Sequence, residues 1–367
     1  MTDLAAQPAP LATARAIHLL DHMGVGGIAR STIELVRHAR MDGDGDEIVL
    51  IGRPLDVDHD FAAPATPVHY LAAAELGPKA AAARLVDLAT SRGAKTVHAH
   101  SLAGLRLGAR AARADRGLSL LATLNEPVPE QLSFFERRAL ARDLRGAGRL
   151  VAPSPALLET WSDFDAPVDL RLAAVDVARF RPGAQPSAWR STRGIGPKTL
   201  LVGCLVRASS DKDHDFVIDA VAELRARGVD AAIQFVGDGP LRPALVERAR
   251  ELAWMHVRRR VMDVPSWFAM VDVVAFASPD ESVPLALIEA MACGRAAVAV
   301  DPGGLRGLVG EAAYLVAPDR PGAYVEALQA LADPGTREAL GHSARERVLE
   351  RHDLSALRTA LAPAYHA

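Results

Sequence analysis

The arrangement of apolar runs is the feature that most limits how this chain can fold. Residues 271–277 and 296–300 are continuous apolar runs of strand length, and residues 283–293 between them have the pattern of a short helix. Apolar runs without polar alternation are typical of strands that are buried on both faces of a parallel sheet. The chain is therefore predicted to be an α/β protein.

Two carboxylates, Glu281 and Glu289, bracket the start of this short helix. Ser282 is suited to cap its first turn, and Gly294 is suited to end it in a left-handed conformation. Ligands of parallel sheets bind where the carboxyl ends of strands meet helix N-termini, and a carboxylate there can accept hydrogen bonds from sugar hydroxyls. Taken alone, the same spacing also fits two solvated surface acids.

The composition bounds the size and setting of the protein. A chain of 367 residues, half of them hydrophobic, can form two domains that each have a core. The formal net charge of −3 gives no reason to expect a nucleic-acid partner. The two cysteines, Cys204 and Cys293, match neither a disulfide framework nor a zinc site, so a reducing cytoplasm is expected and a metal is not.

Residues 1–14 are rich in alanine and proline and lack the order of a secretion signal, so they are predicted to be a disordered leader. No apolar segment approaches the roughly 20 residues needed to cross a bilayer, which predicts a soluble protein. Arginines cluster at residues 106–113 and 137–149. These clusters fit solvated helix faces, and they also leave open a contact with a membrane surface or an anionic acceptor.

Strand-length runs and helical segments alternate in both halves of the chain, which predicts two parallel sheets. Residues 182–197 are rich in glycine, proline and serine without periodicity, and are predicted to be a linker. The expected domains are therefore residues 15–181 and 198–350, followed by a C-terminal helix at 351–367.

Arg207 and Lys212 follow the strand predicted at residues 199–205 and leave its carboxyl end together. A diphosphate leaving group gains negative charge as its bond to a sugar breaks, and two fixed cations stabilise that charge in the transition state. Two basic residues in one loop are also common on protein surfaces. The pair is a candidate anion site that residue types alone do not establish.

The N-terminal half contains two further candidates. His98 and His100 share one face of a predicted strand, which is as typical of buried, hydrogen-bonded histidines as of catalytic ones. Gly26 and Gly27 stand between a strand and a helix, where a glycine backbone can approach a ligand closely. The loop is not G-x-G-x-x-G, because no third glycine follows at the required place, so a dinucleotide-dependent dehydrogenase is disfavoured.

Several of these segments together resemble one known family. Glu-Ser-Val-Pro-Leu-Ala-Leu-Ile-Glu-Ala-Met-Ala-Cys-Gly at 281–294, followed by Asp-Pro-Gly-Gly at 301–304, resembles the E-x7-E region of retaining family-4 glycosyltransferases with the GT-B fold. Arg-x4-Lys-Asp-His at 207–214 resembles that family's diphosphate clamp. His-x-His at 98–100 resembles a segment whose later histidine contacts the donor sugar, and Gly-Gly at 26–27 resembles a loop near the donor phosphate.

The resemblance covers nearly the whole chain and is most specific at residues 202–304. The chain departs from the family pattern where Val206 replaces a glycine, Asn125 a histidine, Ala173-Ala174 an Asn-Gly pair and Gly307 a glutamate. The departures at Asn125, Ala173-Ala174 and Gly307 favour one non-enzymatic alternative, which is a sugar-nucleotide-binding or scaffolding protein of the same fold. A nucleotide-sugar epimerase is an enzymatic alternative, and it would isomerise its donor without an acceptor. A phosphorylase of the pyridoxal type would need a much longer chain.

The resemblance implies two Rossmann-like parallel-sheet domains facing a cleft. It implies retaining transfer of a sugar from a nucleotide diphosphate sugar to an acceptor hydroxyl, with no metal or other cofactor. The implied catalytic residues are His100, Arg207, Lys212 and Glu281. The residues implied to bind the donor are Glu289, at the ribose, and Gly26, Gly27 and the backbone amides of Gly303, Gly304 and Leu305, at the phosphates.

Family analogy also implies a saccharide or lipid-linked acceptor and a role in cell-envelope polysaccharide or glycoconjugate assembly. It implies a cytoplasmic location, and it leaves open a peripheral contact with the inner face of the membrane. The donor base, the donor sugar, the linkage and the oligomeric state carry no motif that would predict them.

Overall fold

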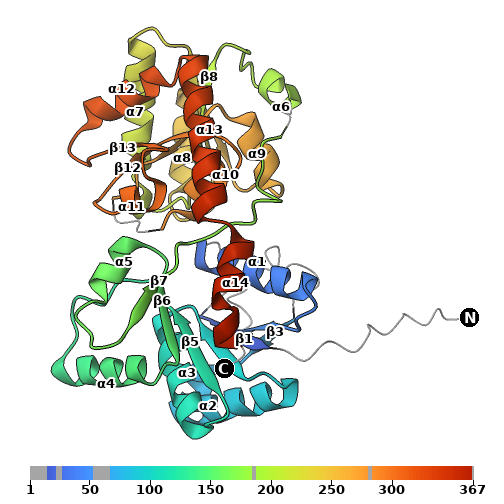
Figure 1. Ribbon diagram of the computed structural model, residues 1–367. Coiled ribbons are helices and arrows are strands. Elements are labelled where there is room, and N and C mark those ends of the chain that lie inside the picture. The colour runs from blue at the N-terminus through green and yellow to red at the C-terminus, as the bar shows by residue number, and fades with distance from the viewer. Residues whose placement is uncertain (1–14, 22–26, 53–66, 184–186, 280–282, 366–367) are drawn as a thin grey trace, which may run out of the picture. The chain divides into compact units, whose positions relative to one another are not determined.

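A computed structural model describes residues 15–21, 27–52, 67–183, 187–279 and 283–365, which form two compact units. Unit 1 contains the described residues up to Pro153, the segment Leu157–Arg171 and the described residues from Arg358 onward; unit 2 contains Ser154–Ala156 and Leu172–Leu357. Each unit has one parallel β-sheet flanked by helices (Figure 1). The prediction of an α/β chain with two Rossmann-like sheets is confirmed.

Unit 1 is built on a seven-stranded parallel sheet in the order β3-β2-β1-β4-β5-β6-β7. Its strands are β1 (Ala16–Leu20), β2 (Glu47–Leu50), β3 (Val68–Tyr70), β4 (Thr96–Ala99), β5 (Ser119–Thr123), β6 (Arg149–Ala152) and β7 (Val168–Leu170). The helices that lie wholly or partly in this unit are α1 (Gly27–Met41), α2 (Ala73–Arg92), α3 (Leu102–Ala114), α4 (Phe134–Arg145), α5 (Pro155–Thr160) and α14 (Leu354–Tyr365). The strand order reverses between β1 and β4.

The two faces of this sheet differ in character because side chains alternate along each strand. Ile17 and Leu19 of β1 and Val97 of β4 point into an apolar core. The opposite face carries His18 and His98, which are register neighbours and are almost fully buried. Buried polar groups need hydrogen-bond partners, so the part of this face that carries the two histidines has to be covered by polar contacts.

Helix α14 supplies some of those contacts. The hydroxyl of Thr96 on β4 donates to the carbonyl of Ala364 at 3.1 Å, and Arg149 on β6 donates to the carbonyl of Ala360 at 3.1 Å. Arg358 pairs with Asp44 at 3.2 Å. The residues of α14 from Arg358 onward therefore belong to unit 1, although the helix begins in unit 2.

Unit 2 is built on a six-stranded parallel sheet in the order β10-β9-β8-β11-β12-β13. Its strands are β8 (Leu200–Leu205), β9 (Ala231–Val236), β10 (Met255–Arg258), β11 (Val273–Phe276), β12 (Ala296–Val300) and β13 (Tyr314–Val316). Its helices are α6 (Ser187–Thr192), the 3-10 helix η2 (Ser210–Lys212), α7 (His214–Ala226), α8 (Arg242–Glu251), α9 (Val264–Met270), α10 (Leu285–Ala292), α11 (Leu305–Val309), α12 (Pro321–Ala330) and α13 (Pro334–Arg351). Here the strand order reverses between β8 and β11.

The linker predicted at residues 182–197 differs from the structure. It contains α6, and the guanidinium of Arg190 on that helix is buried, donating to Asp272 at 3.0 Å and to the carbonyl of Thr199 at 2.6 Å. This ion pair joins α6 to unit 2, and the unit already begins at Leu172. Composition alone could not reveal a short helix held by one arginine.

The helix between β11 and β12 begins slightly later than predicted. It starts at Leu285, with Pro284 as its capping residue, rather than near Val283. Gly294 follows its end with φ of 69°, which is the left-handed stop expected there. Among the described helices, none has both the length and the apolar character needed to cross a bilayer.

Candidate functional site

Five of the predicted site residues follow the strands at which each sheet reverses its order. In unit 2, Arg207 and Lys212 follow β8, and Glu289 lies on the helix that follows β11. In unit 1, His100 follows β4 and Gly27 begins the helix that follows β1. The carboxyl ends of strands at such a reversal leave a crevice in open α/β sheets, and ligands bind there.

Arg207 and Lys212 lie beside the same carboxylate. The Arg207 guanidinium is 3.7 Å from Oδ1 of Asp211, and Nζ of Lys212 is 3.2 Å from Oδ2. Nε of Arg207 also donates to the hydroxyl of Ser209 at 3.2 Å. The Arg207 side chain is 55% exposed, so an incoming anion can reach it.

Asp211 was not singled out by the sequence, although it stands inside the Arg-x4-Lys segment. Burial opposes its ionisation, but hydrogen bonds from Ser209 and Lys212 outweigh this effect and lower the pKa of the Asp211 carboxyl. It is therefore anionic at neutral pH. A phosphate that binds both cations has to compete with this carboxylate.

The backbone that carries Arg207 is held by the tight loop after β9. A Cβ placed on Gly237 would lie 1.9 Å from the carbonyl oxygen of Val206, and one placed on Gly239 would lie 2.4 Å from that of Ala208. Only glycine permits such an approach between two backbones. The two glycines therefore fix the shape of the loop that presents the cations.

The amides of Gly303, Gly304 and Leu305, predicted to hold a phosphate, are bonded within the chain. All three donate to Oδ1 of Asp301, at 2.8, 2.8 and 2.9 Å. Burial opposes the ionisation of this carboxyl, but hydrogen bonds from the backbone amides, those of Gly304, Leu305 and Gly303 first, outweigh it and lower the pKa of Asp301. A phosphate at these amides would have to displace or share the Asp301 carboxylate, and their role at the phosphates stays a prediction.

Glu289 is almost fully buried, with 3% of the residue exposed. Burial raises the pKa of the neighbouring Cys293 thiol to about 12, with a contribution from the charge of Glu289. Glu281 and Gly26 lie outside the described residues. Gly27 is exposed at the start of α1.

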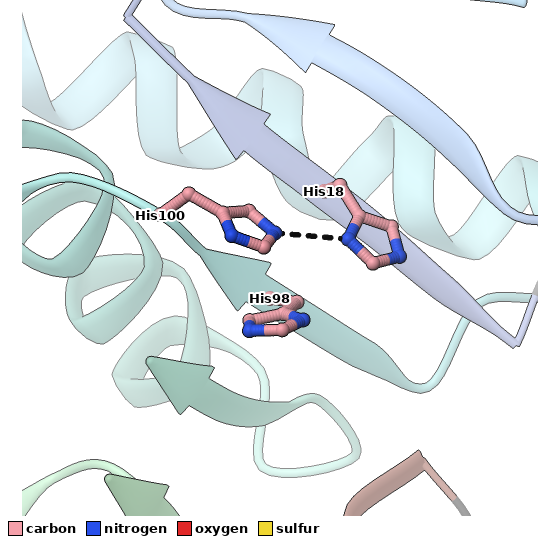
Figure 2. A group of neighbouring side chains, drawn as sticks. All are labelled: His18, His98 and His100. Carbon is pink, nitrogen blue, oxygen red and sulfur yellow. Dashed lines mark hydrogen bonds between the residues drawn. The ribbon is translucent and has the colours of Figure 1, made fainter. Parts of the chain in front are cut away.

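In unit 1, His100 belongs to a buried histidine cluster, which consists of His18, His98 and His100 (Figure 2). Nδ1 of His18 lies 3.0 Å from Nε2 of His100, and Nε2 of His18 lies 3.3 Å from Oδ2 of Asp46. Oδ1 of Asp46 accepts a bond from the backbone amide of Ala16 at 3.0 Å. A continuous chain of hydrogen bonds thus runs from Asp46 through His18 to His100.

The charge on Asp46 limits where the protons of His18 and His100 can lie. Burial disfavours the Asp46 carboxylate, but the His18 bond and charge overcome it and lower the pKa of Asp46. Burial, with a contribution from the charge of His18, lowers the pKa of His100 well below its ordinary value of 6.5. With His18 in its neutral form, the proton on Nε2 bonds the anionic Asp46, and Nδ1 accepts from Nε2 of a neutral His100. This leaves a lone pair on Nδ1 of His100.

The three histidines are close enough together to raise the question of a metal site. One ring nitrogen of each histidine lies within 4.8 Å of the others, a spacing that a cation could bridge. However, Nε2 of His98 is bonded to the hydroxyl of Thr123 at 2.7 Å, and Nδ1 to that of Tyr365 at 2.8 Å. The His98 and His100 rings also pack with centroids 4.0 Å apart instead of converging on one point. The geometry favours a hydrogen-bonded cluster.

The backbone at His100 is anchored on both sides. Its amide donates to the carbonyl of Leu19 at 3.1 Å, and its carbonyl accepts from Nδ2 of Asn125 at 3.1 Å. The hydroxyl of Ser101 caps α3 by accepting from the amide of Gly104 at 3.0 Å. Asn125, a departure from the family pattern, therefore supports His100.

Comparisons with known proteins agree with this fold. Residues 25–177 match the Glycosyltransferase Family 4 domain, and residues 196–333 match the Glycosyl transferases group 1 domain. A D-inositol 3-phosphate glycosyltransferase of Rhodococcus jostii is 30% identical over 242 residues, which are 61% of this chain and 53% of that protein. One of Kribbella flavida is 35% identical over 198 residues, which are 49% of this chain and 46% of that protein.

The chain thus spans about half the length of these curated relatives. Among solved structures, Anabaena Alr3699/HepE in complex with UDP and glucose superposes with a TM-score of 0.79 at 20% identity, covering 96% of this chain and 100% of that one. This likeness shows the GT-B fold. Because the chain matches both family domains, one after the other, and has the fold that they form, it belongs to the group 1, family-4 glycosyltransferases.

Proposed function

We propose that this protein is a retaining glycosyltransferase that moves a sugar from a nucleotide diphosphate sugar to an acceptor hydroxyl. The observation that carries the proposal is the position of Arg207 and Lys212 after β8, where the order of the unit 2 sheet reverses. Two cations held beside one carboxylate at that point suit a diphosphate. Family membership supports the same reading.

In this proposal Arg207 and Lys212 bind the diphosphate and stabilise the charge that it gains as the bond to the sugar breaks. Glu289 accepts hydrogen bonds from the ribose, and Glu281 from hydroxyls of the donor sugar. His100 contacts that sugar through Nδ1. Gly26 and Gly27 contribute backbone amides near the phosphates.

Retention follows if the acceptor attacks from the side that the diphosphate leaves. The departing phosphate oxygen then takes the proton of the acceptor hydroxyl, so no side chain has to act as a base. The two cations supply the positive charge that other transferases obtain from a metal ion, so the proposal assigns no step to one.

The relatives suggest which substrates to test first. Several curated relatives are named for D-inositol 3-phosphate, and the Anabaena protein was solved with UDP and with UDP-glucose. A phosphorylated polyol is therefore the first acceptor to try with UDP-sugars, followed by guanosine and adenosine donors. On family analogy the reaction belongs to cell-envelope or glycoconjugate assembly on the cytoplasmic side of the membrane.

The test is a panel of nucleoside diphosphates and their sugars, scored first by thermal shift and then by transfer to acceptors. A ligand that binds only the folded protein raises its melting temperature. NMR of the product then gives its anomeric configuration. A product with inverted configuration would contradict retention. Binding with neither transfer nor slow donor hydrolysis would indicate a binding protein, and donor isomerisation without an acceptor would indicate an epimerase.

A further inference from the structure

The last turn of helix α14 reaches the buried histidine cluster through Tyr365. The hydroxyl of Tyr365 lies 2.8 Å from Nδ1 of His98, and the centres of the two rings are 5.8 Å apart. The other ring nitrogen of His98, Nε2, lies 2.7 Å from the hydroxyl of Thr123 on β5. Two separate elements, α14 and β5, therefore hold the two ring nitrogens of His98.

The protonation states of these groups suit both hydrogen bonds. Burial, with the charges of His100 and His18, lowers the pKa of His98 well below its ordinary value of 6.5, so the ring is neutral. Burial, followed by the charge of Asp46, raises the pKa of the Tyr365 hydroxyl, which therefore stays protonated. A neutral imidazole has one donor and one acceptor nitrogen, and a hydroxyl can donate or accept. Both nitrogens of His98 are thus satisfied in either tautomer, and turning the ring over would break both bonds.

The fixed ring of His98 packs against the histidine that the proposed reaction uses. Its centre lies 4.0 Å from that of His100 and 5.1 Å from that of His18 (Figure 2). The ring of His100 has a contact of its own with His18, at 3.0 Å. One hydrogen bond holds one nitrogen of His100 and leaves the plane of the ring free to tilt. Contact with a ring that cannot move limits this tilt.

We propose that Tyr365 is a positioning residue for His100. The Tyr365 hydroxyl fixes the ring of His98, and that ring keeps the imidazole of His100 in the plane in which Nδ1 can contact the donor sugar. The inference rests on the proposed contact between His100 and that sugar. Groups that act on a substrate have to be held within about 0.5 Å of their productive positions, so a looser His100 lowers turnover more than it weakens nucleotide binding.

The test is the variant Tyr365→Phe, which removes the hydroxyl and keeps the ring. Nδ1 of His98 then loses its partner. We expect turnover to fall about fivefold, the effect of one hydrogen bond, and the affinity for UDP to stay unchanged. Thr123→Val removes the partner of the other ring nitrogen and should lower turnover by a similar factor. Initial rates at saturating donor and isothermal titration with UDP measure the two quantities.

A second measurement does not depend on any reaction. With a neutral His18, the N–H at Nε2 of His100 is bonded to Nδ1 of His18, and nitrogen-15 NMR of the imidazoles follows its exchange with solvent. In Tyr365→Phe this proton should exchange about fivefold faster, because the ring of His100 is held less firmly. A wild-type chain that transfers no sugar would contradict the proposed function, whereas the exchange rate would still test the positioning of His100.

Thr96→Val is the matched control. The hydroxyl of Thr96 donates to the carbonyl of Ala364 at 3.1 Å, so this variant loosens the same turn of α14 and leaves the bond between Tyr365 and His98 in place. It should lower the melting temperature and keep the turnover and the His100 exchange rate of the wild type. Circular dichroism checks that every variant folds.

Three outcomes would overturn the proposal. One is an unchanged exchange rate of the His100 proton in Tyr365→Phe. Another is unchanged turnover of that variant when the wild type is active. The third is an equal effect of Thr96→Val on both quantities, because the docking of α14 as a whole would then explain the result.

Discussion

Nδ1 of His18 lies 3.0 Å from Nε2 of His100, and this contact extends the hydrogen-bond chain of Asp46 to the end of β4. The carboxylate accepts on both oxygens, from the amide of Ala16 and from His18. With a neutral His18, the direction of both bonds is therefore set from the Asp46 end. His18 and Asp46 act as positioning residues that decide which nitrogen of His100 carries the proton.

The first prediction is that Asp46→Asn reverses the direction of the hydrogen bonds that run from residue 46 through His18 to His100. The amide of Ala16 is a fixed donor, so the new side chain must keep its oxygen there and turn its NH2 toward His18. His18 then accepts on Nε2 and donates from Nδ1, and His100 is left protonated on Nδ1, where the proposed sugar contact needs a lone pair. We expect turnover to fall roughly tenfold or more, with little change in UDP affinity.

Glu47→Gln is the matched control. Glu47 is the next residue in the sequence, its carboxylate is also buried, and it bonds a different histidine, His69, at 2.7 Å. It should cost stability without changing turnover. Nitrogen-15 shifts of the imidazoles report the tautomers directly. An unchanged His100 tautomer in Asp46→Asn would show that the bonds do not act as one chain.

The second prediction concerns the acid between the two cations. Asp211→Asn removes a negative charge that competes with an incoming diphosphate, so UDP should bind several-fold more tightly. Lys212→Ala should have the opposite effect and lower turnover on the order of 100-fold while leaving the melting temperature nearly unchanged. Isothermal titration and initial rates measure both. Asp219→Asn, on the exposed side of α7, serves as the charge control, and weaker UDP binding by Asp211→Asn would contradict the assignment.

The third prediction is a pH-dependent cost of losing Asp301. Its folded-state pKa lies below the ordinary value of 3.8, so its stabilising effect is present above that pH and is lost as pH falls through the folded-state pKa. Asp301→Ala should lower the free energy of unfolding by about 1 kcal/mol at neutral pH, the usual cost of a lost cap. The difference from wild type should shrink as urea unfolding is repeated at pH below 3.8. A difference that stays constant with pH would mean that the bonds to Gly303, Gly304 and Leu305 do not depend on the charge.

The fourth prediction tests the packing behind the cations. Gly237→Ala places a Cβ against the carbonyl of Val206, and neither backbone can move without displacing the segment that leads to Arg207. We expect a loss of stability on the order of 3 kcal/mol and weaker UDP binding. Gly322→Ala, on α12, meets no atom within 4 Å and should be neutral or slightly stabilising. Chemical denaturation compares the two, and equal stability would show that the loop can relax.

The fold could be predicted from the sequence because buried parallel strands leave long apolar runs. Residues 271–277 and 296–300 correspond to β11 and β12. The left-handed conformation predicted for Gly294, just after the helix between these strands, was also confirmed, because glycine adopts that conformation readily. The domain boundary was harder to place. Unit 2 already begins at Leu172, and Arg190 inside the predicted linker pairs with Asp272, which is far away in the sequence.

The site was harder to predict than the fold. Arg207 and Lys212 could be paired from their spacing, but Asp211 gains its role from the turn that brings its two oxygens against both cations. Asp301 precedes a Pro-Gly-Gly turn, and that signal could have indicated a carboxylate bonded to its own backbone. Asp46 shows no such signal, because its bond to His18 depends on the pairing of β1 with β2.

The attachment of α14 to unit 1 has a consequence for synthesis on the ribosome. Tyr365 and Arg358 complete the covered face of the β1 and β4 sheet, yet most of unit 2 is translated between β7 and these residues. While unit 2 emerges and folds, the polar side chains of that face have no helix over them. The nascent chain should therefore expose an unfinished sheet for the time that it takes to translate unit 2, and this interval is when chaperones are expected to bind it.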